Sequence, residues 1–377
     1  MEKMSFSGQK SQFFPSKTQI IVFSNFKFPI SNIILSKLRR LTNMNILLLG
    51  GTGNISSDVA LCLAEKGNSI TLLTSGKTSA SSRYNHIKAN RHDKAGMASA
   101  LKNATFDCAI DFIGFTAEHC EIARECLQGK IGHYIFISSA TVYKKPHTVL
   151  PITENMPQGN PFSEYAQKKI ACEQYLATAH ANDFPVTIVR PSHTFGKTWI
   201  PSPLHGADWT VAARILDSKP VVLHDNGQSL WTLTAASDFA EAIAGIAGND
   251  KALGGSFHIT SDQPLTWNAI YFEIGQALGK EPNIIHIPTG FLAKHVPGAT
   301  ARLTGDKAQH GVFDNTRIKR LCPTWECRKT FRAAIRESVA WFNENESRKI
   351  ADTNKDRRID LLIEKWKKSG AATAECV

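Results

Sequence analysis

The chain has 377 residues, 42% of them hydrophobic and 20% charged, and this balance excludes collagen-like, low-complexity and disulfide-scaffold proteins. Its 44 Lys and Arg residues against 33 Asp and Glu give a net charge of +11. Residues 1–43 contain seven of the basic residues and one acid, so the rest of the chain is only mildly basic. We therefore expect anionic metabolites as ligands and do not expect a nucleic-acid partner.

Residues 1–43 are expected to be an extension outside the fold. They are rich in Ser, Phe and Lys and show no sustained period of 2 or 3.6. One interpretation is a targeting segment, and the other is a start site assigned too early, because Met44 directly precedes a buried-strand pattern. We favour the early start. No stretch approaches the roughly 18 apolar residues of a membrane span, so we expect a soluble, cytoplasmic protein.

Short apolar runs alternate with longer amphipathic ones from Met44 to residue 190, and this alternation predicts a parallel sheet covered by helices. The predicted strands are Asn45–Leu49, Ser69–Thr74, Cys108–Phe112, Tyr134–Ser138 and Val186–Val189. Apolar residues at helical spacing follow the first strand, and a second helix is predicted at Ala117–Leu127. We therefore predict a doubly wound α/β domain over residues 44–190.

A smaller lobe that faces the substrate is predicted over residues 191–345, where Pro and Gly interrupt the pattern more often. Helices are predicted there near Trp209–Leu216, Ala236–Ile246, Trp267–Leu278 and Phe331–Asn343. Residues 346–377 form a charged C-terminal tail. Ile359, Leu362, Ile363 and Trp366 lie there at i, i+3, i+4 and i+7, which predicts a helix with one apolar stripe.

A glycine-rich segment, Gly50-Gly51-Thr52-Gly53-Asn54-Ile55-Ser56, lies between the first strand and the first helix. A dinucleotide-binding fold needs a tight turn at this point and a helix N-terminus open to a pyrophosphate. Ser56 stands where a third glycine is usual. The predicted cofactor-binding residues of this turn are Gly50, Thr52, Gly53, Asn54 and Ile55.

The end of the second predicted strand has no acidic residue to bind the adenosine ribose of NAD. Ser75, Lys77 and Arg83 lie nearby and would suit the 2′-phosphate of NADP. The choice between NAD and NADP therefore stays open.

Tyr165 and Lys169 lie four residues apart on a predicted helix, so both side chains project from one face. A nearby ammonium favours the phenolate, which would allow the tyrosine to exchange protons near neutral pH. Ser139 follows the strand ending at Ser138, at the sheet edge where open α/β folds bind ligands. Tyr165, Lys169 and Ser139 are the predicted catalytic residues.

The glycine turn, Ser139-Ala140-Thr141-Val142-Tyr143, the Tyr165 and Lys169 pair and Val189-Arg190-Pro191-Ser192 occur in an order that resembles the extended short-chain dehydrogenase/reductases. The resemblance is to their NAD-dependent epimerase/dehydratase group. It implies a Rossmann fold over residues 44–190, Tyr165 as the acid/base, Ser139 on the reacting oxygen, and Lys169 on the nicotinamide ribose. It also implies that Lys169 lowers the pKa of Tyr165.

Three positions depart from the pattern of this group. Besides Ser56, Asn90 stands where an aspartate often contacts adenine, and Lys144 follows Tyr143 where epimerases commonly have glycine. The first two affect the expected affinity for the cofactor, and Lys144 argues against identity with any particular epimerase.

The predicted function is an NAD(P)-dependent epimerase or dehydratase that oxidises a hydroxyl-bearing carbon of a nucleotide sugar to a transient ketone. His193, Trp199, His205 and Trp209 are expected to line the substrate pocket. The alternatives are an NADP-dependent reductase of a non-sugar carbonyl and a non-catalytic RNA-binding or regulatory relative. No metal site is expected. The resemblance also implies a homodimer formed through the helix with Tyr165.

Overall fold

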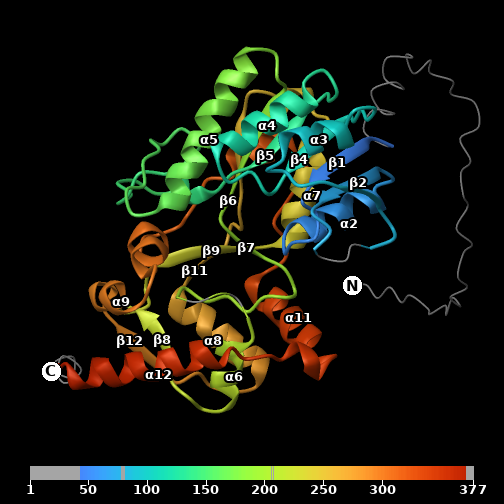
Figure 1. Cartoon of the computed structure of the whole chain (residues 1–377). Helices are drawn as coiled ribbons and strands as arrows, with labels where there is room; N and C mark the ends of the chain where they lie inside the picture. Colours follow the sequence, from blue (N-terminus) through green and yellow to red (C-terminus); the bar gives the residue numbers. More distant parts are fainter. Residues whose placement is uncertain (1–42, 78–80, 205, 207, 371–377) are drawn as a thin grey trace, which may run out of the picture. The chain divides into compact units, whose positions relative to one another are not determined.

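The computed structural model describes residues 43–77, 81–204, 206 and 208–370, so the predicted extension lies outside the described residues except for Asn43. A parallel sheet of seven strands runs in the order β10-β6-β5-β4-β1-β2-β3 (Figure 1). Its strands are β1 (Asn45–Leu49), β2 (Ser69–Thr74), β3 (Asn85–Lys88), β4 (Cys108–Asp111), β5 (Tyr134–Ile137), β6 (Val186–Pro191) and β10 (Ser256–Ile259). The predicted Rossmann-type sheet is confirmed.

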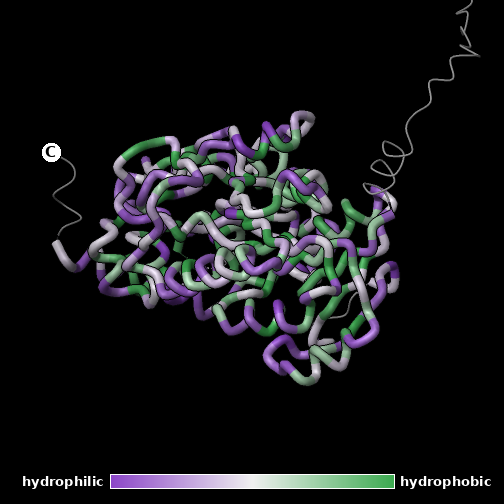
Figure 2. The backbone as a smooth tube through the Cα atoms, turned by 90° about the horizontal axis from the view of Figure 1, so that it is seen from above, coloured by the Kyte–Doolittle hydropathy of each residue, from purple (hydrophilic) through white to green (hydrophobic). Residues whose placement is uncertain are grey.

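Helices cover both faces of this sheet, so its central strands are buried on both sides. Figure 1 shows α3 (Lys94–Ala100), α4 (Ala117–Leu127) and α5 (Glu164–Ala181) on one face. On the other face α2 (Ser56–Glu65) packs against α7 (Ala236–Ile246). Hydrophobic stretches run through the interior of the described chain, and hydrophilic residues are frequent on the outer turns (Figure 2). Among the described residues, no helix combines the length and apolar character needed to cross a membrane.

The second lobe contains two small sheets, ordered β11-β9-β7 and β12-β8. Its strands are β7 (His193–Phe195), β8 (Val221–His224), β9 (Leu230–Ala235), β11 (Pro264–Thr266) and β12 (Ile284–Ile287). Its helices are α6 (Thr210–Leu216), α8 (Trp267–Leu278), α9 (Thr289–His295), a π-helix η3 (Thr300–Lys307), α11 (Phe331–Asn343) and α12 (Thr353–Lys368). The helix α10 (Thr316–Leu321) packs instead against α7 and β10 in the core of the main sheet. The four helices predicted between residues 209 and 343 are therefore present.

The boundary expected at residue 190 does not separate two consecutive blocks of chain. After β7 and β9 the chain returns to the main sheet, where α7 joins its core and β10 pairs with β6. The core includes Phe239, Ile243 and Ile259 beside residues of β1 and β2. Residues 236–259 therefore complete the first unit, although the sequence predicted them as part of the second lobe.

The helix predicted in the C-terminal tail is α12. Ile359, Leu362, Ile363 and Trp366 are all buried, in a cluster with Leu292 of α9 and residues of η3. Figure 1 shows α12 lying along the second lobe. The tail is therefore an integral part of that lobe.

A buried ion pair joins β6 to α5. The Arg190 guanidinium donates to both carboxylate oxygens of Glu173, with Nη2 2.6 Å from Oε2. Both side chains are less than one-tenth exposed. Arg190 also donates to the Tyr143 hydroxyl at 2.9 Å, and Ser138 donates to Glu173 at 2.5 Å. The pair thus links the helix with Tyr165 to the segment around Ser139.

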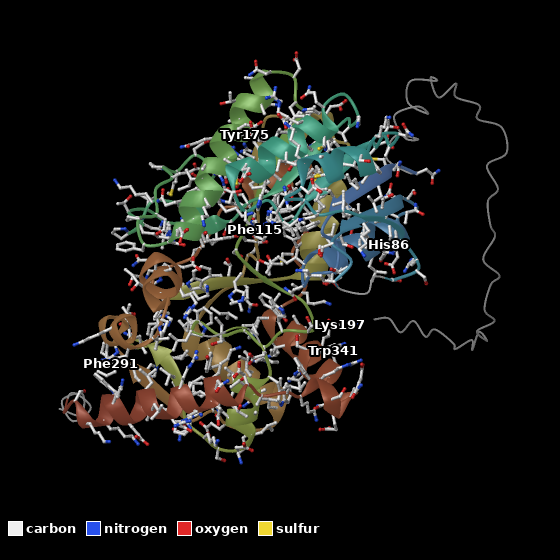
Figure 3. All side chains as sticks on the ribbon, in the orientation of Figure 1. His86, Phe115, Tyr175, Lys197, Phe291 and Trp341 are labelled. Carbon is white, nitrogen blue, oxygen red and sulfur yellow. The ribbon has the colours of Figure 1, made fainter. Side chains whose placement is uncertain are left out.

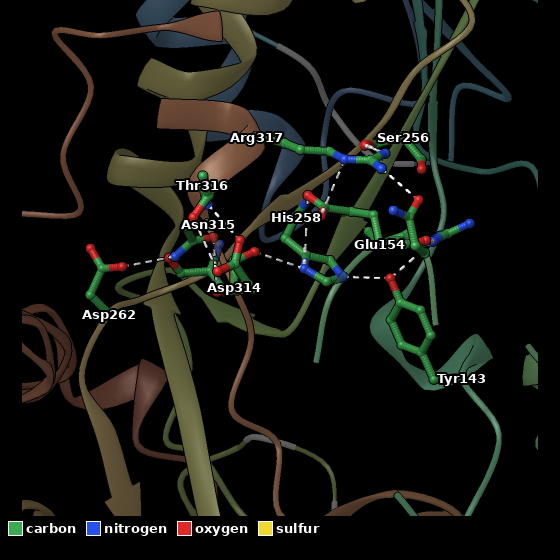
Figure 4. Close-up of polar contacts among 12 residues, drawn as sticks. Tyr143, Glu154, Ser256, His258, Asp262, Asp314, Asn315, Thr316 and Arg317 are labelled. Atoms are coloured by element: carbon green, nitrogen blue, oxygen red, sulfur yellow. Dashed lines mark hydrogen bonds and ion pairs between the residues drawn. The ribbon is translucent and has the colours of Figure 1, made fainter. Parts of the chain in front are cut away.

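The same network continues into the C-terminal half of the chain. Figure 4 shows the hydroxyl of Tyr143 beside the His258 ring of β10, whose other ring nitrogen lies 3.0 Å from the Asp314 carbonyl. The backbone N–H of His258 donates to Glu154 at 2.9 Å. Burial lowers the pKa of His258 to about 4, so the ring is neutral near pH 7. The His258 ring therefore takes part in this network as a neutral group.

Replacing Arg190 by methionine leaves the Glu173 carboxylate buried without its partner. We expect Arg190→Met to lower the free energy of unfolding by about 3–5 kcal/mol in urea denaturation. Arg190→Met with Glu173→Gln should recover part of the loss, because no buried charge then remains. Lys168→Met, which breaks the exposed pair with Glu164 on the same helix, is the control and should cause little change. Equal effects of Arg190→Met and Lys168→Met would contradict this account.

Candidate active site

A cavity of about 780 Å³ extends from the glycine turn, past the carboxyl ends of β4, β5 and β6, to residues of the second lobe. Phe115, labelled in Figure 3, lies where the main sheet meets that lobe, and it lines this cavity. The carboxyl ends of the strands form the ligand-binding edge of open α/β sheets. All the residues predicted for catalysis and for cofactor binding line the cavity.

The glycine turn has the conformation that its sequence predicts. Gly50 and Gly51 have φ values of +102° and +106°, which L-residues rarely adopt. A Cβ on Gly51 would lie 2.6 Å from Leu72 Cδ2, so backbone and strand are already in close contact. Among the described residues, no side chain caps α2, and of its first N–H groups that of Ser57 donates to the Gly53 carbonyl at 3.0 Å. The turn thus fits the pyrophosphate of a dinucleotide.

Two side chains hold this turn in place. The amide oxygen of Asn54 accepts from the N–H of Gly196 at 2.8 Å, which ties the turn to the segment after β7. The Ser56 hydroxyl is buried and accepts from the N–H of Gly53 at 2.9 Å. Ser56 therefore takes the position of the third glycine, and its hydroxyl forms a hydrogen bond with the turn.

Ser139 and Tyr165 come together in the middle of the cavity. Ser139 follows β5, and its Oγ accepts from the Thr141 N–H at 3.3 Å and lies 2.9 Å from Thr141 Oγ1. The Ser139 and Tyr165 side chains are neighbours in this cavity. Desolvation by the surrounding groups raises the pKa of the Tyr165 phenol to about 12, although 44% of the residue is exposed; Ser139 opposes the rise and Asp306 adds to it. The residues of this chain therefore keep the phenol protonated near pH 7.

The pKa of Tyr165 is raised, whereas the family resemblance implied that Lys169 would lower it. Lys169 is 1% exposed, and its ammonium donates to the carbonyls of Gly114 at 2.8 Å and Ile137 at 2.7 Å. It lies 5.9 Å from the centroid of the Tyr165 ring, over the face of the ring. Burial lowers the pKa of Lys169, while Asp111 opposes that shift. An ammonium has three N–H donors, and the two carbonyls use two of them.

Aromatic side chains from β7 and β9 form one wall on the side of the second lobe. His193, Trp199 and Trp231 line the cavity, and the His193 and Trp199 rings have their centroids 6.4 Å apart. Trp231 is fixed because its indole N–H donates to the carbonyls of Lys307 and Gln309, both at 3.0 Å. Burial lowers the pKa of His193 to about 3, so this ring is neutral at physiological pH.

Charged residues of η3 face the same half of the cavity. Arg302, Asp306 and Lys307 all line it. The Lys307 ammonium donates to Asp306 Oδ2 at 2.9 Å, while Asp306 Oδ1 is buried without a hydrogen-bond partner among the described residues. Sequence reasoning missed these three residues and Trp231, because a short π-helix has no recognisable sequence period. The adjacent opposite charges of Asp306 and Lys307 were the one available signal.

Several expected residues lie elsewhere. Trp209 is buried in the core of the second lobe, and His205 lies outside the described residues. Ser75, Lys77 and Arg83 are exposed and do not line the cavity. Asn90 is also outside it, and its side chain accepts from the N–H of His92 at 3.1 Å. Within the described ranges, no three His, Cys, Asp or Glu side chains gather as a metal site would require.

The match to known proteins agrees with this geometry. Residues 46–259 match the model of the NAD dependent epimerase/dehydratase family. The chain belongs to this family. Family members bind NAD(P), and the glycine turn and cavity described above fit such a cofactor. When bound, it would supply the hydride acceptor or donor, with the turn at its pyrophosphate.

Curated relatives in this family have different names and activities. The chain is 26% identical to 2′-dehydrokanamycin reductase of Streptomyces kanamyceticus over 75% of its own length and 80% of the relative. It is 28% identical to a chloroplast stem-loop binding protein of 41 kDa from Arabidopsis thaliana, over 64% of its own length and 65% of the relative. The family is thus established, and the substrate is not.

Solved structures share the fold. A UDP-glucose 4-epimerase from Bifidobacterium longum, in complex with NAD⁺ and UDP, superposes with a TM-score of 0.66 and 19% identity, over 80% of this chain and 99% of that one. An epimerase from Methanothermobacter thermautotrophicus gives a TM-score of 0.69 and 16% identity, over 85% of this chain and 98% of that one. These likenesses confirm the fold.

The glycines of the turn differ in what a side chain would disturb. A Cβ on Gly53 would meet only Ser56 Oγ at 3.4 Å, an ordinary contact. We expect Gly53→Ala to change the free energy of unfolding by less than about 1 kcal/mol and to weaken NAD binding measured by calorimetry. Gly51→Ala, strained and in contact with Leu72, should cost about 1–3 kcal/mol in urea denaturation. A Gly53→Ala protein with unchanged affinity for NAD and NADP would contradict the assignment of the turn.

The raised pKa of Tyr165 can be measured by ultraviolet titration of the cofactor-free protein. The difference in phenolate absorbance between wild type and Tyr165→Phe should stay near zero from pH 7 to pH 10, because burial disfavours the charged phenolate. An ordinary tyrosine would be about half ionised at pH 10. Ionisation of Tyr165 at or below pH 10 would show that its surroundings favour the phenolate after all.

Proposed function

We propose that the protein catalyses NAD(P)-dependent oxidation at a hydroxyl-bearing carbon of a nucleotide sugar, through a transient ketone. One observation carries the proposal. Ser139 and Tyr165 lie together in one cavity, with a dinucleotide-type glycine turn on one side and an aromatic, charged wall on the other. This is the arrangement that hydride transfer with coupled proton transfer requires.

In this proposal, side chains of the protein itself carry out the proton transfer. Tyr165 first loses its own proton to water; the phenolate then takes the proton of the substrate hydroxyl and returns it when the ketone is reduced. Ser139 holds the reacting oxygen beside the phenol through its hydroxyl. Lys169 keeps one N–H for a ribose hydroxyl of the cofactor, and its positive charge would oppose the burial that raises the pKa of Tyr165. Reduction on the opposite face gives an epimer, and elimination before reduction gives a dehydrated product.

The second-lobe side of the cavity supports a sugar as the substrate. Trp199 offers an apolar ring to a sugar, and the unpaired Asp306 Oδ1 can accept from a hydroxyl. Arg302 and Lys307 offer charge to a phosphate. The Bifidobacterium longum structure with the same fold contains NAD⁺ and UDP, and its title names it a UDP-glucose 4-epimerase. Nucleotide sugars are therefore the first substrates to test.

A reductase that releases its product is the second candidate. The relative from Streptomyces kanamyceticus is named a reductase and aligns over 80% of its length. The missing acid after β2 is also compatible with NADP, which such an enzyme would exchange at each turnover. The stem-loop binding relative leaves an RNA-binding function as the third alternative, and the assembled Ser139, Tyr165 and Lys169 argue against it.

Tyr165→Phe removes the transferred proton and leaves the ring in place. We expect it to lower kcat by about 10³-fold, while NAD affinity changes little. Tyr175→Phe on the same helix (Figure 3) is the matched control and should retain wild-type turnover. Turnover should be followed with nucleotide sugars, after mass spectrometry of any nucleotide released on denaturation. Retained NAD supports internal hydride return, and full activity of Tyr165→Phe would disprove the mechanism.

A further inference from the structure

The peptide bond between Gly114 and Phe115 is held at both of its polar groups. Its carbonyl, that of Gly114, accepts from the Lys169 ammonium at 2.8 Å. Its N–H, that of Phe115, donates to Nδ1 of His119 at 3.1 Å. The Phe115 ring lines the active-site cavity, with its centroid 5.1 Å from the same ammonium. A movement of this peptide would therefore take away one of the partners that hold Lys169.

His119 lies in the first turn of α4, at a position where a titratable acceptor is unusual. Thr116 is the N-cap of the helix, and its hydroxyl accepts from the His119 N–H at 3.3 Å. In a capping box, a Glu or Gln at the position of His119 returns a hydrogen bond to the N–H of the N-cap residue. Here the returned bond reaches one residue further back, to Phe115. A glutamine amide accepts at every pH, whereas an imidazole nitrogen stops accepting once it is protonated.

A second histidine continues this contact to the surface. Nε2 of His119 lies 2.9 Å from Nδ1 of His92, which is an exposed residue. Because Phe115 donates to Nδ1 of His119, the proton of the neutral His119 ring is on Nε2 and is donated to His92. Nδ1 of His92 therefore has no proton of its own. A proton added to either Nδ1 atom would place two N–H groups face to face.

The charges around His119 favour its neutral form. Burial lowers the pKa of His119, and the Arg91 guanidinium and the His92 ring act in the same direction. Asp111 and Glu118 act in the opposite direction. Arg91 is fixed there because it donates to the Asp111 carboxylate at 2.7 Å and to the His119 carbonyl at 2.8 Å. The neutral ring is thus the form present near pH 7, and it is lost as the pH falls through the lowered pKa.

We propose that His119 is a positioning residue for Lys169 and acts through the Gly114–Phe115 peptide. Protonation of His119 or His92 then releases this peptide and weakens binding of the NAD(P) ribose. The inference rests on the proposed function, in which the third N–H of Lys169 binds a ribose hydroxyl. A buried ammonium that loses one of its two carbonyl partners is held less firmly, so the affinity for the cofactor falls with the pH.

The test measures the NAD affinity of the full chain by calorimetry from pH 7.5 to pH 5. In wild type we expect the affinity to fall by at least about threefold over this range. His119→Gln keeps an acceptor for the Phe115 N–H that does not titrate, so it should bind NAD normally at pH 7.5 and lose most of the pH dependence. His119→Leu has no acceptor and should bind NAD about tenfold more weakly at pH 7.5.

The matched control is His86→Gln, at an exposed histidine of β3 that does not line the cavity (Figure 3). This variant should keep the wild-type pH profile. A second readout needs no cofactor, because NMR can follow the backbone amide signal of Phe115. The signal should shift as the pH falls in wild type and stay nearly in place in His119→Gln.

Two results would overturn the inference: the same pH profile of NAD affinity in wild type and His119→Gln, as a purely structural helix cap would give, or a Phe115 signal that does not respond to pH. If NAD binding and Tyr165-dependent turnover are present in wild type, the proposed function stands despite either result. If wild type binds neither NAD nor NADP, the proposed function fails, and the NMR readout alone decides whether His119 holds the peptide.

Discussion

The buried ion pair between Arg190 and Glu173 joins the parts of the chain that hold Ser139 and Tyr165. Glu173 belongs to α5, the helix with Tyr165 and Lys169, and it accepts from Ser138, the neighbour of Ser139. Arg190 ends β6 and reaches the Tyr143 hydroxyl. Because breaking a buried pair leaves an uncompensated charge, the pair holds helix and strand end in one arrangement. The distance between the hydroxyls of Ser139 and Tyr165 therefore depends on this ion pair.

Lys169 adds a second constraint at the same sheet edge. Its ammonium bridges the carbonyls of Gly114 and Ile137, which follow β4 and end β5. A charge with so little exposure is tolerable because it has these partners and lies over the Phe136 ring, 4.6 Å from its centroid. The lysine is thus fixed by the protein's own groups, and desolvation raises the pKa of Tyr165.

The second lobe provides a rim of charge and aromatic surface around the ligand-binding edge of the sheet. The π-helix η3 places Arg302, Asp306 and Lys307 on this rim, and the Lys307 carbonyl accepts from the indole N–H of Trp231. The helix α12 packs against the same lobe through its buried apolar stripe.

The sequence by itself determined the order of strands and helices, the glycine turn and the pairing of Tyr165 with Lys169, because periodicity, glycine conformation and i, i+4 spacing are local properties. β3 escaped prediction since its four residues are largely exposed and polar. Only the tertiary structure decided that α7 and β10 return to the main sheet and that Asp306 reaches the site. The raised pKa of Tyr165 likewise could not be read from the sequence, because desolvation depends on everything packed around a group.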